Sequence, residues 1–414
     1  MVATRAIVSR EPTQPLRPNW ALETVHVGPL GDEDVLVEMH AAGICHTDLL
    51  LGSLPRGALG IAYPKVAGHE GAGVIQAVGS QVRDIQVGDP VLLSFYSCSA
   101  CHECQSSHPA YCDEFATGNY PGNIGSMKAS DNAEPIWSQF FGQSSFSAHS
   151  VVRKSCVVNV KEQIKDIGEL KLFASLGCGF QTGMGAVQNL ARAVPDDVAL
   201  IMGMGAVGMG ALLTAKIAGC KSIIAVDRIK SRLDLATRLG ASHVIDTSDP
   251  AYVKLDDAVR QIIPTGTSVV IDTTAIPAIV EQAIETTRAR SRILLIGVFP
   301  PGYQLPVGVS QHMQKGRSII GCIEGDCVPQ EVSPIISQSR GNGSQHQAIP
   351  QMIQWYRDGK FPIDLLLQYF EVRADLSHHQ SRNIYLPFLK AAEYEMAIAE
   401  MKNGNVIKPV LLWK

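Results

Sequence analysis

A cluster of four cysteines constrains this chain more than any other feature. They follow the spacing C-x2-C-x2-C-x7-C and are Cys98, Cys101, Cys104 and Cys112. Thiolates are soft ligands, and four of them from one loop can surround a zinc ion tetrahedrally. Because protein atoms would fill all four positions, such a site is structural rather than catalytic. A disulfide pair, buried free thiols and an iron–sulfur cluster are the alternatives that the sequence leaves open.

The composition limits the partners that this chain can have. Its 414 residues are 46% apolar and 18% charged, with a formal net charge of −4. This length predicts two or three domains, and this charge gives no reason to expect nucleic acid or an anionic membrane as a partner. No apolar run reaches the length of a membrane span, and the N-terminus lacks an apolar signal core and carries Glu11 early. We therefore expect a cytoplasmic protein whose ten cysteines are thiols and metal ligands rather than disulfides.

The N-terminal part of the chain has mainly the character of β-strands. Residues 35–39 and 73–78 predict strands, with glycine and proline at the joins. Residues 140–146 and 150–152 return to strand character. Between these segments, residues 113–139 predict a polar loop with little periodicity.

Three further metal-competent side chains lie beside glycines. Cys45 occurs in Gly-Ile-Cys-His-Thr-Asp, His69 in Gly-His-Glu-Gly-Ala-Gly, and Cys178 between two glycines. A lone cysteine or histidine is usually a core residue. However, Cys45 and His69 lie in the same β-rich region as the four-cysteine loop, which favours a role as ligands.

Strands and helices alternate between residues 198 and 322. Six apolar segments predict strands, at residues 198–202, 222–227, 243–247, 268–272, 292–297 and 318–322. The segments between them have helical character. This alternation predicts a doubly wound parallel sheet.

A glycine fingerprint for a dinucleotide follows the first of these strands. Gly203, Gly205 and Gly208 form G-x-G-x-x-G between a strand and a helix, and Asp227 follows Gly208 by 19 residues. In this context the glycines let a helix N-terminus meet a pyrophosphate. The aspartate would bind the ribose hydroxyls of NAD and repel the 2′-phosphate of NADP. Arg228 complicates this preference, because a guanidinium there could tolerate or attract that phosphate.

The C-terminal part of the chain combines insertions with regular elements. Residues 333–347 predict an inserted surface loop, and residues 349–357 an amphipathic helix. A second insertion, near residues 373–387, precedes a helix at residues 390–402. Residues 405–413 predict a final strand.

Together these motifs resemble those of the zinc-dependent medium-chain alcohol dehydrogenases, and within them the aryl-alcohol (benzyl-alcohol) dehydrogenase branch. The resemblance covers nearly the whole chain, apart from insertions near residues 124–137, 331–347 and 373–387. The branch is indicated by four further segments, Leu93–Cys98, Phe141–Phe146, Gln181–Gly183 and Ile323–Asp326.

The resemblance implies an α/β fold of two domains. A Rossmann domain with a doubly wound parallel sheet would bind the coenzyme, and a β-rich GroES-like domain would be catalytic. The expected ranges are residues 1–180 and 326–414 for the catalytic domain, and residues 181–325 for the NAD-binding domain.

The resemblance also implies a catalytic zinc in addition to the structural one. Its ligands would be Cys45, His69 and Cys178, which leave a fourth position for water or substrate. Asp48 would orient His69 by a hydrogen bond, and Glu70 would lie beside the metal as a transient ligand. Both carboxylates could instead be structural.

The implied reaction is binding of an alcohol to zinc, loss of its proton and hydride transfer to the nicotinamide. Thr47 matches the hydroxyl that passes the proton toward the nicotinamide ribose. Liver-type relatives end this relay with a histidine three residues later, where this chain has Leu50, so the proton would leave through His46 or water. His46 and Lys408 match positions that contact the coenzyme pyrophosphate, and Thr182 matches one near the nicotinamide.

The sequence thus predicts a zinc- and NAD-dependent dehydrogenase that interconverts a primary, aromatic or allylic alcohol and its aldehyde. Candidates for an aromatic wall of the substrate site are Phe95, Tyr96, Phe140 and Phe141, which are also consistent with ordinary packing. The only partners expected are a small alcohol or aldehyde and further copies of the chain, in a homodimer or homotetramer.

Three alternatives stay open. A glutathione-dependent formaldehyde dehydrogenase would need a cationic anchor, which the matched segments do not show. A non-catalytic, zinc-stabilised coenzyme-binding protein and a zinc-free quinone reductase are both disfavoured by the intact set of Cys45, His69 and Cys178.

Overall fold

The structure, a computed structural model of the chain, describes residues 1–14, 17–329, 347–372 and 393–413. These residues form two compact units. Unit 1 comprises Met1–Cys178, Pro329 and the described residues from Asp364 onward, and unit 2 comprises Gly179–Val328 and residues 347–363.

The division into units differs from the expected ranges by two or three residues at their boundaries (residues 179–180 and 326–328 fall in unit 2), and by a larger segment at residues 347–363. These residues fall within the range expected for the catalytic domain, but their contacts place them in unit 2. Phe361 packs against Phe180 with the ring centroids 6.3 Å apart. The Gln188 side chain donates a hydrogen bond of 3.1 Å to the Gln351 side chain. A helical pattern in the sequence cannot indicate which of two cores the helix covers.

Unit 2 is built on a six-stranded parallel sheet with the order β12-β11-β10-β13-β14-β15. Its strands are β10 (Val198–Met202), β11 (Ser222–Asp227), β12 (His243–Asp246), β13 (Thr267–Asp272), β14 (Thr287–Leu295) and β15 (Ser318–Gly321). Each neighbouring pair is parallel. All six expected strands are present, and the predicted doubly wound sheet is confirmed.

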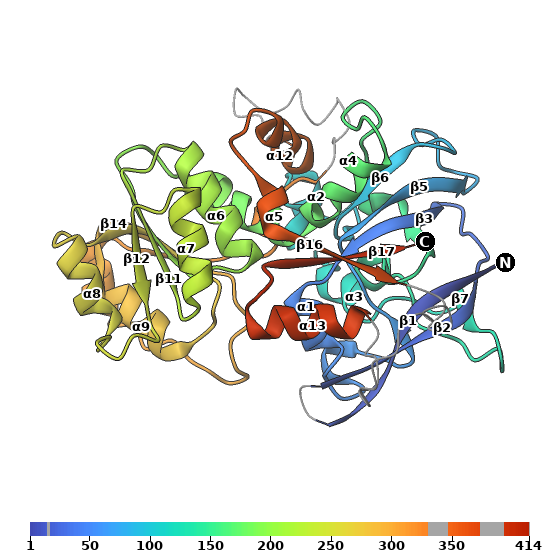
Figure 1. Ribbon diagram of the computed structural model, residues 1–414, viewed down its shortest axis with the longest axis horizontal. Coiled ribbons are helices and arrows are strands. Elements are labelled where there is room, and N and C mark those ends of the chain that lie inside the picture. Colours follow the sequence, from blue (N-terminus) through green and yellow to red (C-terminus); the bar gives the residue numbers. More distant parts are fainter. Residues whose placement is uncertain (15–16, 330–346, 373–392, 414) are drawn as a thin grey trace, which may run out of the picture. The chain divides into compact units, whose positions relative to one another are not determined.

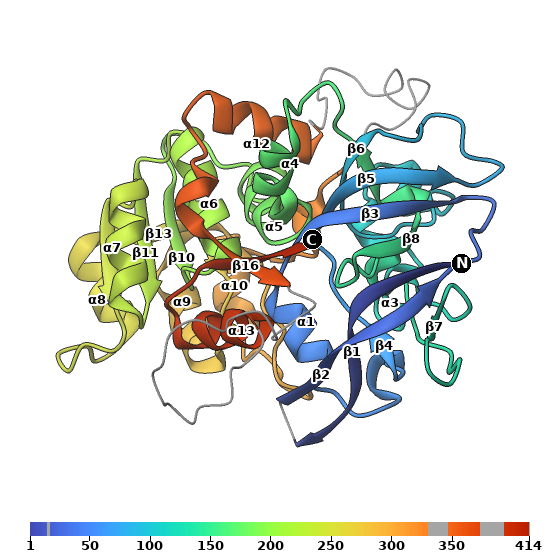
Figure 2. The ribbon, with the colours of Figure 1, turned by 45° about the vertical axis from the view of Figure 1, so that its right-hand side comes forward.

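Helices cover both faces of this sheet. The helices of unit 2 are α5 (Gly179–Gly185), η6 (Ala186–Leu190), α6 (Ala206–Ile217), α7 (Lys230–Leu239), α8 (Leu255–Ile262), α9 (Pro277–Glu285), α10 (Val309–Lys315), η7 (Glu324–Asp326) and α12 (Ala348–Arg357). Leu200 on one face of β10 shares a core with Val259 of α8 and Val280 of α9. Ile201 on the opposite face is buried too, and α6 and α7 lie side by side over the strands (Figures 1 and 2). Burial on both faces explains why these strands are continuous apolar runs.

Unit 1 contains two mainly antiparallel sheets. One has the order β4-β1-β2-β7, and the other has the order β16-β17-β3-β5-β6-β9 with β8 also paired to β3. The strands are β1 (Val2–Gln14), β2 (Arg17–Val27), β3 (Asp34–Gly43), β4 (Lys65–Val66), β5 (Gly71–Val78), β6 (Pro90–Leu93), β7 (Met127–Ala129), β8 (His149–Arg153), β9 (Val157–Asn159), β16 (Leu367–Val372) and β17 (Lys408–Trp413). Strand β17, from the C-terminal end, pairs with β3 through Val410 and Gly43 (Figure 1). Both ends of the chain therefore build this unit.

The helices of unit 1 are short and lie between the strands. They are α1 (His46–Leu51), η1 (Ala58–Gly60), α2 (His102–Gln105), η2 (Pro109–Tyr111), α3 (Phe115–Asn119), η3 (Phe140–Gly142), η4 (Lys154–Cys156), α4 (Ile167–Leu172), η5 (Ala174–Gly177), η8 (Ile363–Leu366, which begins at the last residue of unit 2) and α13 (Glu393–Asn403). Within the described parts of the chain, no helix is both long and apolar enough to cross a membrane.

Two expectations for unit 1 are wrong. Residues 113–139, expected as a loop, contain α3 and β7, whose few apolar residues are too sparse to show a period. Residues 140–146, expected as a strand, form a tight turn around η3. Phe141 and Ser144 have φ angles of 50° and 52°, in the left-handed region that a strand cannot contain. The insertion expected near residues 373–387 lies outside the described residues, as does all but residue 347 of the one at 331–347.

Candidate metal centre

Four metal-competent side chains from separate parts of unit 1 meet at one place. The ligand atoms of Cys45, His69, Glu70 and Cys178 all lie within 4.8 Å of one another. Cys45 directly precedes α1, His69 and Glu70 lie between β4 and β5, and Cys178 follows η5. The structure thus brings together the three expected ligands and the neighbouring glutamate.

Asp48 organises the loops that carry two of these ligands. Its Oδ1 atom lies 2.9 Å from His69 Nδ1 and accepts a hydrogen bond of 3.0 Å from the Gly68 amide. Its Oδ2 atom accepts a hydrogen bond of 2.9 Å from the Cys45 amide. The carboxylate is fully buried. The carboxylate therefore fixes the orientation of the imidazole: Nδ1 is hydrogen-bonded to Asp48, and Nε2 is left to bind a metal.

The remaining imidazole nitrogen fits a metal ligand. His69 Nε2 is buried, and it has no hydrogen-bond partner among the described residues. A buried polar atom without a partner is costly in a folded protein. Two cysteine sulfurs within reach of this nitrogen complete the kind of donor set that binds zinc with one position left open.

The backbone around His69 requires the residues found there. Gly68 has a φ of +91°, and a Cβ atom at this position would collide with Phe146 and Ser145. The Gln143 side chain donates hydrogen bonds of 2.9 Å and 2.8 Å to the carbonyls of His69 and Ser94. The turn that contains Gln143 therefore holds the main chain of His69 in place.

The charges at this centre favour a thiolate at Cys45. A hydrogen bond with Cys178 lowers the pKa of the Cys45 thiol most, and the nearby charge of Lys408 lowers it further, so that the pKa is well below its ordinary value despite burial. Burial raises the pKa of Glu70, and the positive charge of Lys408 partly offsets this rise. The thiolate is the form of cysteine that binds a metal.

The residues of the expected proton relay lie on α1. Thr47 lies in the first turn of α1, and its Oγ1 atom is 3.8 Å from Cys45 Sγ. His46 is exposed at the start of the same helix, and Leu50 is half-buried one turn beyond. A hydroxyl thus lies beside the candidate ligand Cys45, and one turn later comes a side chain that cannot carry a proton.

Aromatic rings surround the His69 imidazole. Phe141 stacks on it with the centroids 4.5 Å apart, and the Phe140 ring lies edge to face at 5.8 Å. Phe115 and Tyr120 extend the group by packing against Phe141 at 6.2 Å and 5.9 Å. These four rings form the cluster that we call the aromatic cluster.

Two of its members, Phe115 and Tyr120, were not expected from the sequence, because they lie in the segment predicted as a loop. Of the expected wall residues, Phe95 reaches the cluster by packing against Phe115 at 5.8 Å. Tyr96 instead donates a hydrogen bond to Glu114, and its ring packs against the Arg153 guanidinium at 4.4 Å.

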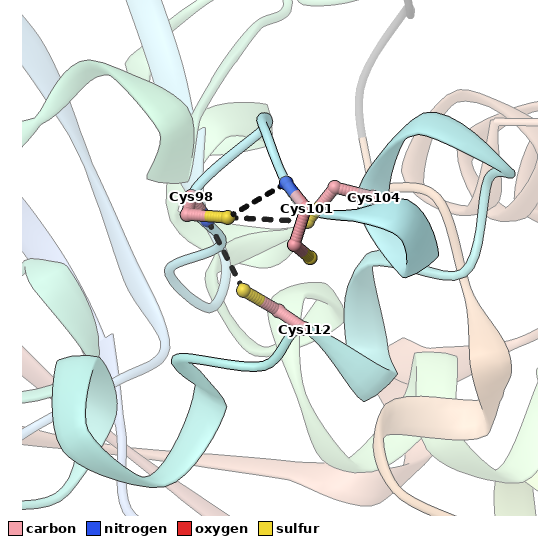
Figure 3. Close-up of side chains that lie close together, drawn as sticks. All are labelled: Cys98, Cys101, Cys104 and Cys112. Atoms are coloured by element: carbon pink, nitrogen blue, oxygen red, sulfur yellow. Dashed lines mark hydrogen bonds between the residues drawn. The ribbon is translucent and has the colours of Figure 1, made fainter.

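The four-cysteine loop converges on one point (Figure 3). The sulfur atoms of Cys98, Cys101, Cys104 and Cys112 lie within 4.8 Å of one another. The Cys101 amide donates to Cys98 Sγ at 3.3 Å, and the Cys98 amide donates to Cys112 Sγ at 3.3 Å. None of the ten cysteines is joined to another by a disulfide, and this holds for the four sulfurs of the loop. Amide donors that point at sulfur stabilise thiolates, which is what a four-thiolate metal site requires.

The glycine fingerprint of unit 2 has the geometry of a dinucleotide site. Gly203 follows β10 with a φ of +89°, and a Cβ atom there would collide with Thr273. Gly205 precedes α6, and a Cβ atom there would point into open space. That space in front of a helix N-terminus fits an approaching pyrophosphate. A Cβ atom at Gly208 would collide with the Gly203 carbonyl, which explains the third glycine.

Asp227 ends β11 beside this turn. It accepts hydrogen bonds of 2.7 Å and 2.9 Å from the Arg228 and Ile229 amides at Oδ1, and one of 2.7 Å from the Met204 amide at Oδ2. These bonds orient the carboxylate and leave lone pairs for ribose hydroxyls. The Arg228 side chain is exposed.

The other two expected coenzyme residues have partners within their own units. Thr182 in α5 is buried, and its hydroxyl lies 3.5 Å from Glu324 Oε2. Lys408 is buried at the candidate metal centre, with Nζ 2.7 Å from Glu70 Oε1. It is therefore not a solvated surface cation.

Comparisons with known proteins agree with this geometry. A family model for the alcohol dehydrogenase GroES-like domain matches residues 31–162, and one for zinc-binding dehydrogenases matches residues 206–339. A geraniol dehydrogenase of Castellaniella defragrans is 33% identical to this chain, over 100% of the chain and 98% of its own length.

Solved structures give the same result. The crystal structure of benzyl alcohol dehydrogenase from Acinetobacter calcoaceticus matches with a TM-score of 0.82 at 30% identity and covers 100% of both chains. An alcohol dehydrogenase zinc-binding domain protein from Burkholderia ambifaria matches with a TM-score of 0.84 at 32% identity and covers 99% of both chains.

Two features together define the class of protein. They are a Rossmann-type parallel sheet and a β-rich unit that carries a Cys-His-Cys donor set, and they are typical of a metal-dependent dehydrogenase. The whole-length relatives make the assignment more specific. The chain belongs to the zinc-dependent medium-chain alcohol dehydrogenases.

Proposed function

We propose that this chain is a zinc-dependent, NAD-linked dehydrogenase of primary aromatic or allylic alcohols, working in either direction between alcohol and aldehyde. The observation that carries the proposal is the convergence of Cys45, His69 and Cys178, with His69 Nε2 buried and without a hydrogen-bond partner in the described part of the chain. A protein that only sensed coenzyme would have no use for a metal site with an open position.

The residues of unit 1 have distinct roles in this proposal. Zinc held by the three donors supplies a Lewis acid that lowers the pKa of an alcohol hydroxyl. Asp48 holds the His69 imidazole in the orientation that presents Nε2. Thr47 accepts a hydrogen bond from the alcohol hydroxyl and relays the proton, taking it as its own hydroxyl proton passes on toward the nicotinamide ribose. Because Leu50 cannot accept that proton, it leaves through His46 or water. Glu70, held by Lys408, serves as a transient ligand.

Unit 2 supplies the coenzyme site. NAD bound there provides the hydride acceptor. Gly203, Gly205 and Gly208 admit its pyrophosphate, and Asp227 accepts hydrogen bonds from its ribose. The carboxylate favours NAD over NADP, while exposed Arg228 weakens this preference. Residues 1–180 and 326–414 are proposed as the catalytic domain and residues 181–325 as the coenzyme domain, except that residues 347–363 pack with unit 2. His46, Thr182 and Lys408 are proposed as further coenzyme contacts.

The substrate class follows from the aromatic cluster and from the relatives. Rings stacked on and around a ligand imidazole suit a flat, apolar substrate. Two whole-length relatives are named for geraniol, an allylic alcohol, and for benzyl alcohol. In both substrates the carbon that carries the hydroxyl is bonded to an unsaturated carbon.

The chain is proposed to act in the cytoplasm as a homodimer or homotetramer. Thiol ligands stay reduced in that compartment. Strand β15 pairs only with β14 among the described residues, and so forms an edge of the parallel sheet. Val309 and Met313, on one face of the nearby helix α10, are 80% and 71% exposed. Apolar exposure beside a free sheet edge supports assembly through this face.

A panel of benzylic, allylic and aliphatic alcohols, assayed with NAD and NADP by absorbance, tests the proposal. Benzylic and allylic alcohols are expected to turn over fastest, with NAD. Equal or faster turnover of aliphatic alcohols would remove the aromatic assignment, and fastest turnover of S-(hydroxymethyl)glutathione would favour the formaldehyde dehydrogenase alternative. Cys45→Ser should abolish turnover, whereas Cys220→Ser, outside both cysteine groups, should not.

A further inference from the structure

A lysine is buried beside the candidate catalytic centre without a carboxylate partner. Lys65, in β4, has no exposed surface. Its Nζ atom donates one hydrogen bond, of 3.4 Å, to the Leu51 carbonyl at the end of α1. Among the described residues it forms no ion pair. Moving an ammonium group out of water without a counter-ion costs a large amount of free energy.

Aromatic rings take the place of a counter-ion. Lys65 Nζ lies 4.8 Å from the centroid of the Phe140 ring and 5.7 Å from that of Tyr63. Cation–π contacts of desolvated ammonium groups are attractive, and the carbonyl at a helix C-terminus adds to the attraction. The cation is therefore held at one defined point behind the Phe140 ring.

This ring leads directly to the metal ligands. Phe140 packs edge to face on the His69 imidazole at 5.8 Å, and it contacts Phe141 at 4.9 Å. Phe141 in turn stacks on His69. Moving the Phe140 ring by a fraction of an ångström would therefore disturb both a metal ligand and the aromatic cluster.

An apolar side chain would fill the same space at lower cost. Replacing a buried charge by a hydrophobic group of similar volume is often neutral or stabilising. A charge kept in such a place, next to a reactive centre, is a candidate for a functional role. We propose that Lys65 is a positioning residue, whose ammonium holds Phe140 against His69 and so sets the aromatic cluster for an unsaturated alcohol.

This inference rests on the proposed function for its substrate, but its geometry lies entirely within unit 1. Among the described residues, Asp48 and Tyr63 are charged or titratable groups near Lys65. Asp48 of α1 is the carboxylate whose charge acts on it. The Tyr63 ring that faces Lys65 also has the Arg56 guanidinium near it, with Cζ 6.0 Å from the ring centroid. Burial lowers the pKa of Lys65 to about 8, and Asp48 opposes this change.

The variant Lys65→Met, which keeps the length and removes the charge, tests the proposal. Since small displacements of positioned groups cost one to two orders of magnitude in rate, we expect kcat/KM for benzyl alcohol to fall about tenfold, mainly through KM. Turnover of ethanol, which cannot use the ring cluster, should change much less. The visible bands of the Co²⁺-substituted protein, which report the geometry around His69, should shift. Ser9→Ala is the matched control, because Ser9 pairs with Lys65 across the sheet and has no charge.

The outcomes separate this inference from the proposed function. If the wild-type protein oxidises no alcohol, the proposed function fails, and the Co²⁺ spectra of wild type and Lys65→Met still decide the role of Lys65. If the wild type is active and Lys65→Met leaves both the KM for benzyl alcohol and the Co²⁺ bands unchanged, Lys65 is only a buried charge and the inference is wrong. If Lys65→Met does not fold, Lys65→Gln, which retains a donor for the Leu51 carbonyl, is measured in the same way.

Discussion

Lys408 Nζ lies 2.7 Å from Glu70 Oε1, and the two side chains are 2% and 0% exposed. Lys408 belongs to β17, and it also donates a hydrogen bond of 3.3 Å to the Ile44 carbonyl, next to the candidate ligand Cys45. The C-terminal strand thus places a positive charge among thiolates and a carboxylate that would otherwise repel one another.

Removing this cation should be costly. Lys408→Met removes the cation that pairs with the buried Glu70 carboxylate, and breaking a buried pair in this way typically costs about 3–5 kcal/mol in the free energy of unfolding. The double variant Lys408→Met/Glu70→Gln should recover part of that loss. Urea unfolding measures both. Lys154→Met is the matched control, since its partner Asp84 is also 2.7 Å away but lies at the surface, where a pair contributes about 0–1 kcal/mol. Equal losses for Lys408→Met and Lys154→Met would contradict this prediction.

Asp48→Asn should weaken metal binding more than it weakens the fold. Asparagine keeps the shape of Asp48 but cannot accept hydrogen bonds at both ends from the Cys45 and Gly68 amides and the imidazole. Loss of such an orienting group typically lowers metal affinity about 10–100-fold. Zinc retention against a chelator measures the effect, and Asp84→Asn at the surface serves as the control. Unchanged retention in Asp48→Asn would show that His69 is oriented by other contacts.

Sequence reasoning predicted those parts of the molecule that short motifs encode. The strand and helix alternation gave the parallel sheet, because buried parallel strands are continuous apolar runs. The residues Cys45, His69 and Cys178 were expected to meet only because the motifs around them resemble a family. Their spacing along the chain does not predict convergence, which depends on how strands far apart in the sequence pair with one another.

The contacts around the ligands could not be predicted in the same way. Phe115 and Tyr120 lie in a segment without periodicity. Phe141 has a left-handed backbone conformation, although its sequence context predicts a strand. Lys65 had only a weak signal, a charged residue in a short apolar run directly before the His69 motif. Its burial follows from the pairing of β4 with β1 and from the turn that carries Phe140, and neither can be read from local sequence.

Asp227→Gly should change the choice of coenzyme. The substitution removes the carboxylate that would repel a 2′-phosphate and leaves exposed Arg228 to attract it. We expect the ratio of kcat/KM for NAD to that for NADP to fall about tenfold or more, as expected when roughly 1.4 kcal/mol of discrimination is lost. Asp227 also accepts the Met204 amide, so the variant should bind both coenzymes more weakly. Asp234→Gly, on the exposed surface of α7, is the control; an unchanged ratio in Asp227→Gly would place the discrimination elsewhere.

The four-cysteine loop should support the aromatic cluster as well as its own fold. The Glu114 amide donates to Cys112 Sγ at 3.4 Å, and the next residue, Phe115, begins α3 and packs on Phe141. Cys104→Ser should therefore remove about one zinc per chain and lower the melting temperature, since structural zinc contributes directly to folding. It should also raise KM for aromatic alcohols. Cys220→Ser should leave all three quantities unchanged. A normal zinc content in Cys104→Ser would contradict the four-thiolate site.

The burial of Lys65 should make the stability of the fold depend on alkaline pH. The pKa of this group falls from 10.5 in the unfolded chain to about 8 in the folded one. Between these values the unfolded chain binds the proton more strongly, so the free energy of unfolding gains a positive contribution as pH rises from about 8 to 10.5. Below pH 8 the wild type carries the full penalty of a buried ammonium, which Lys65→Met lacks. The variant should therefore be more stable at pH 7 by up to about 3 kcal/mol, from 1.36 kcal/mol per pKa unit, and this advantage should shrink toward pH 10. Urea unfolding of both proteins across this pH range measures the contribution of Lys65 to the free energy of unfolding, because the other titrating groups are common to both. A stability difference that is independent of pH would show that Lys65 does not titrate within the fold.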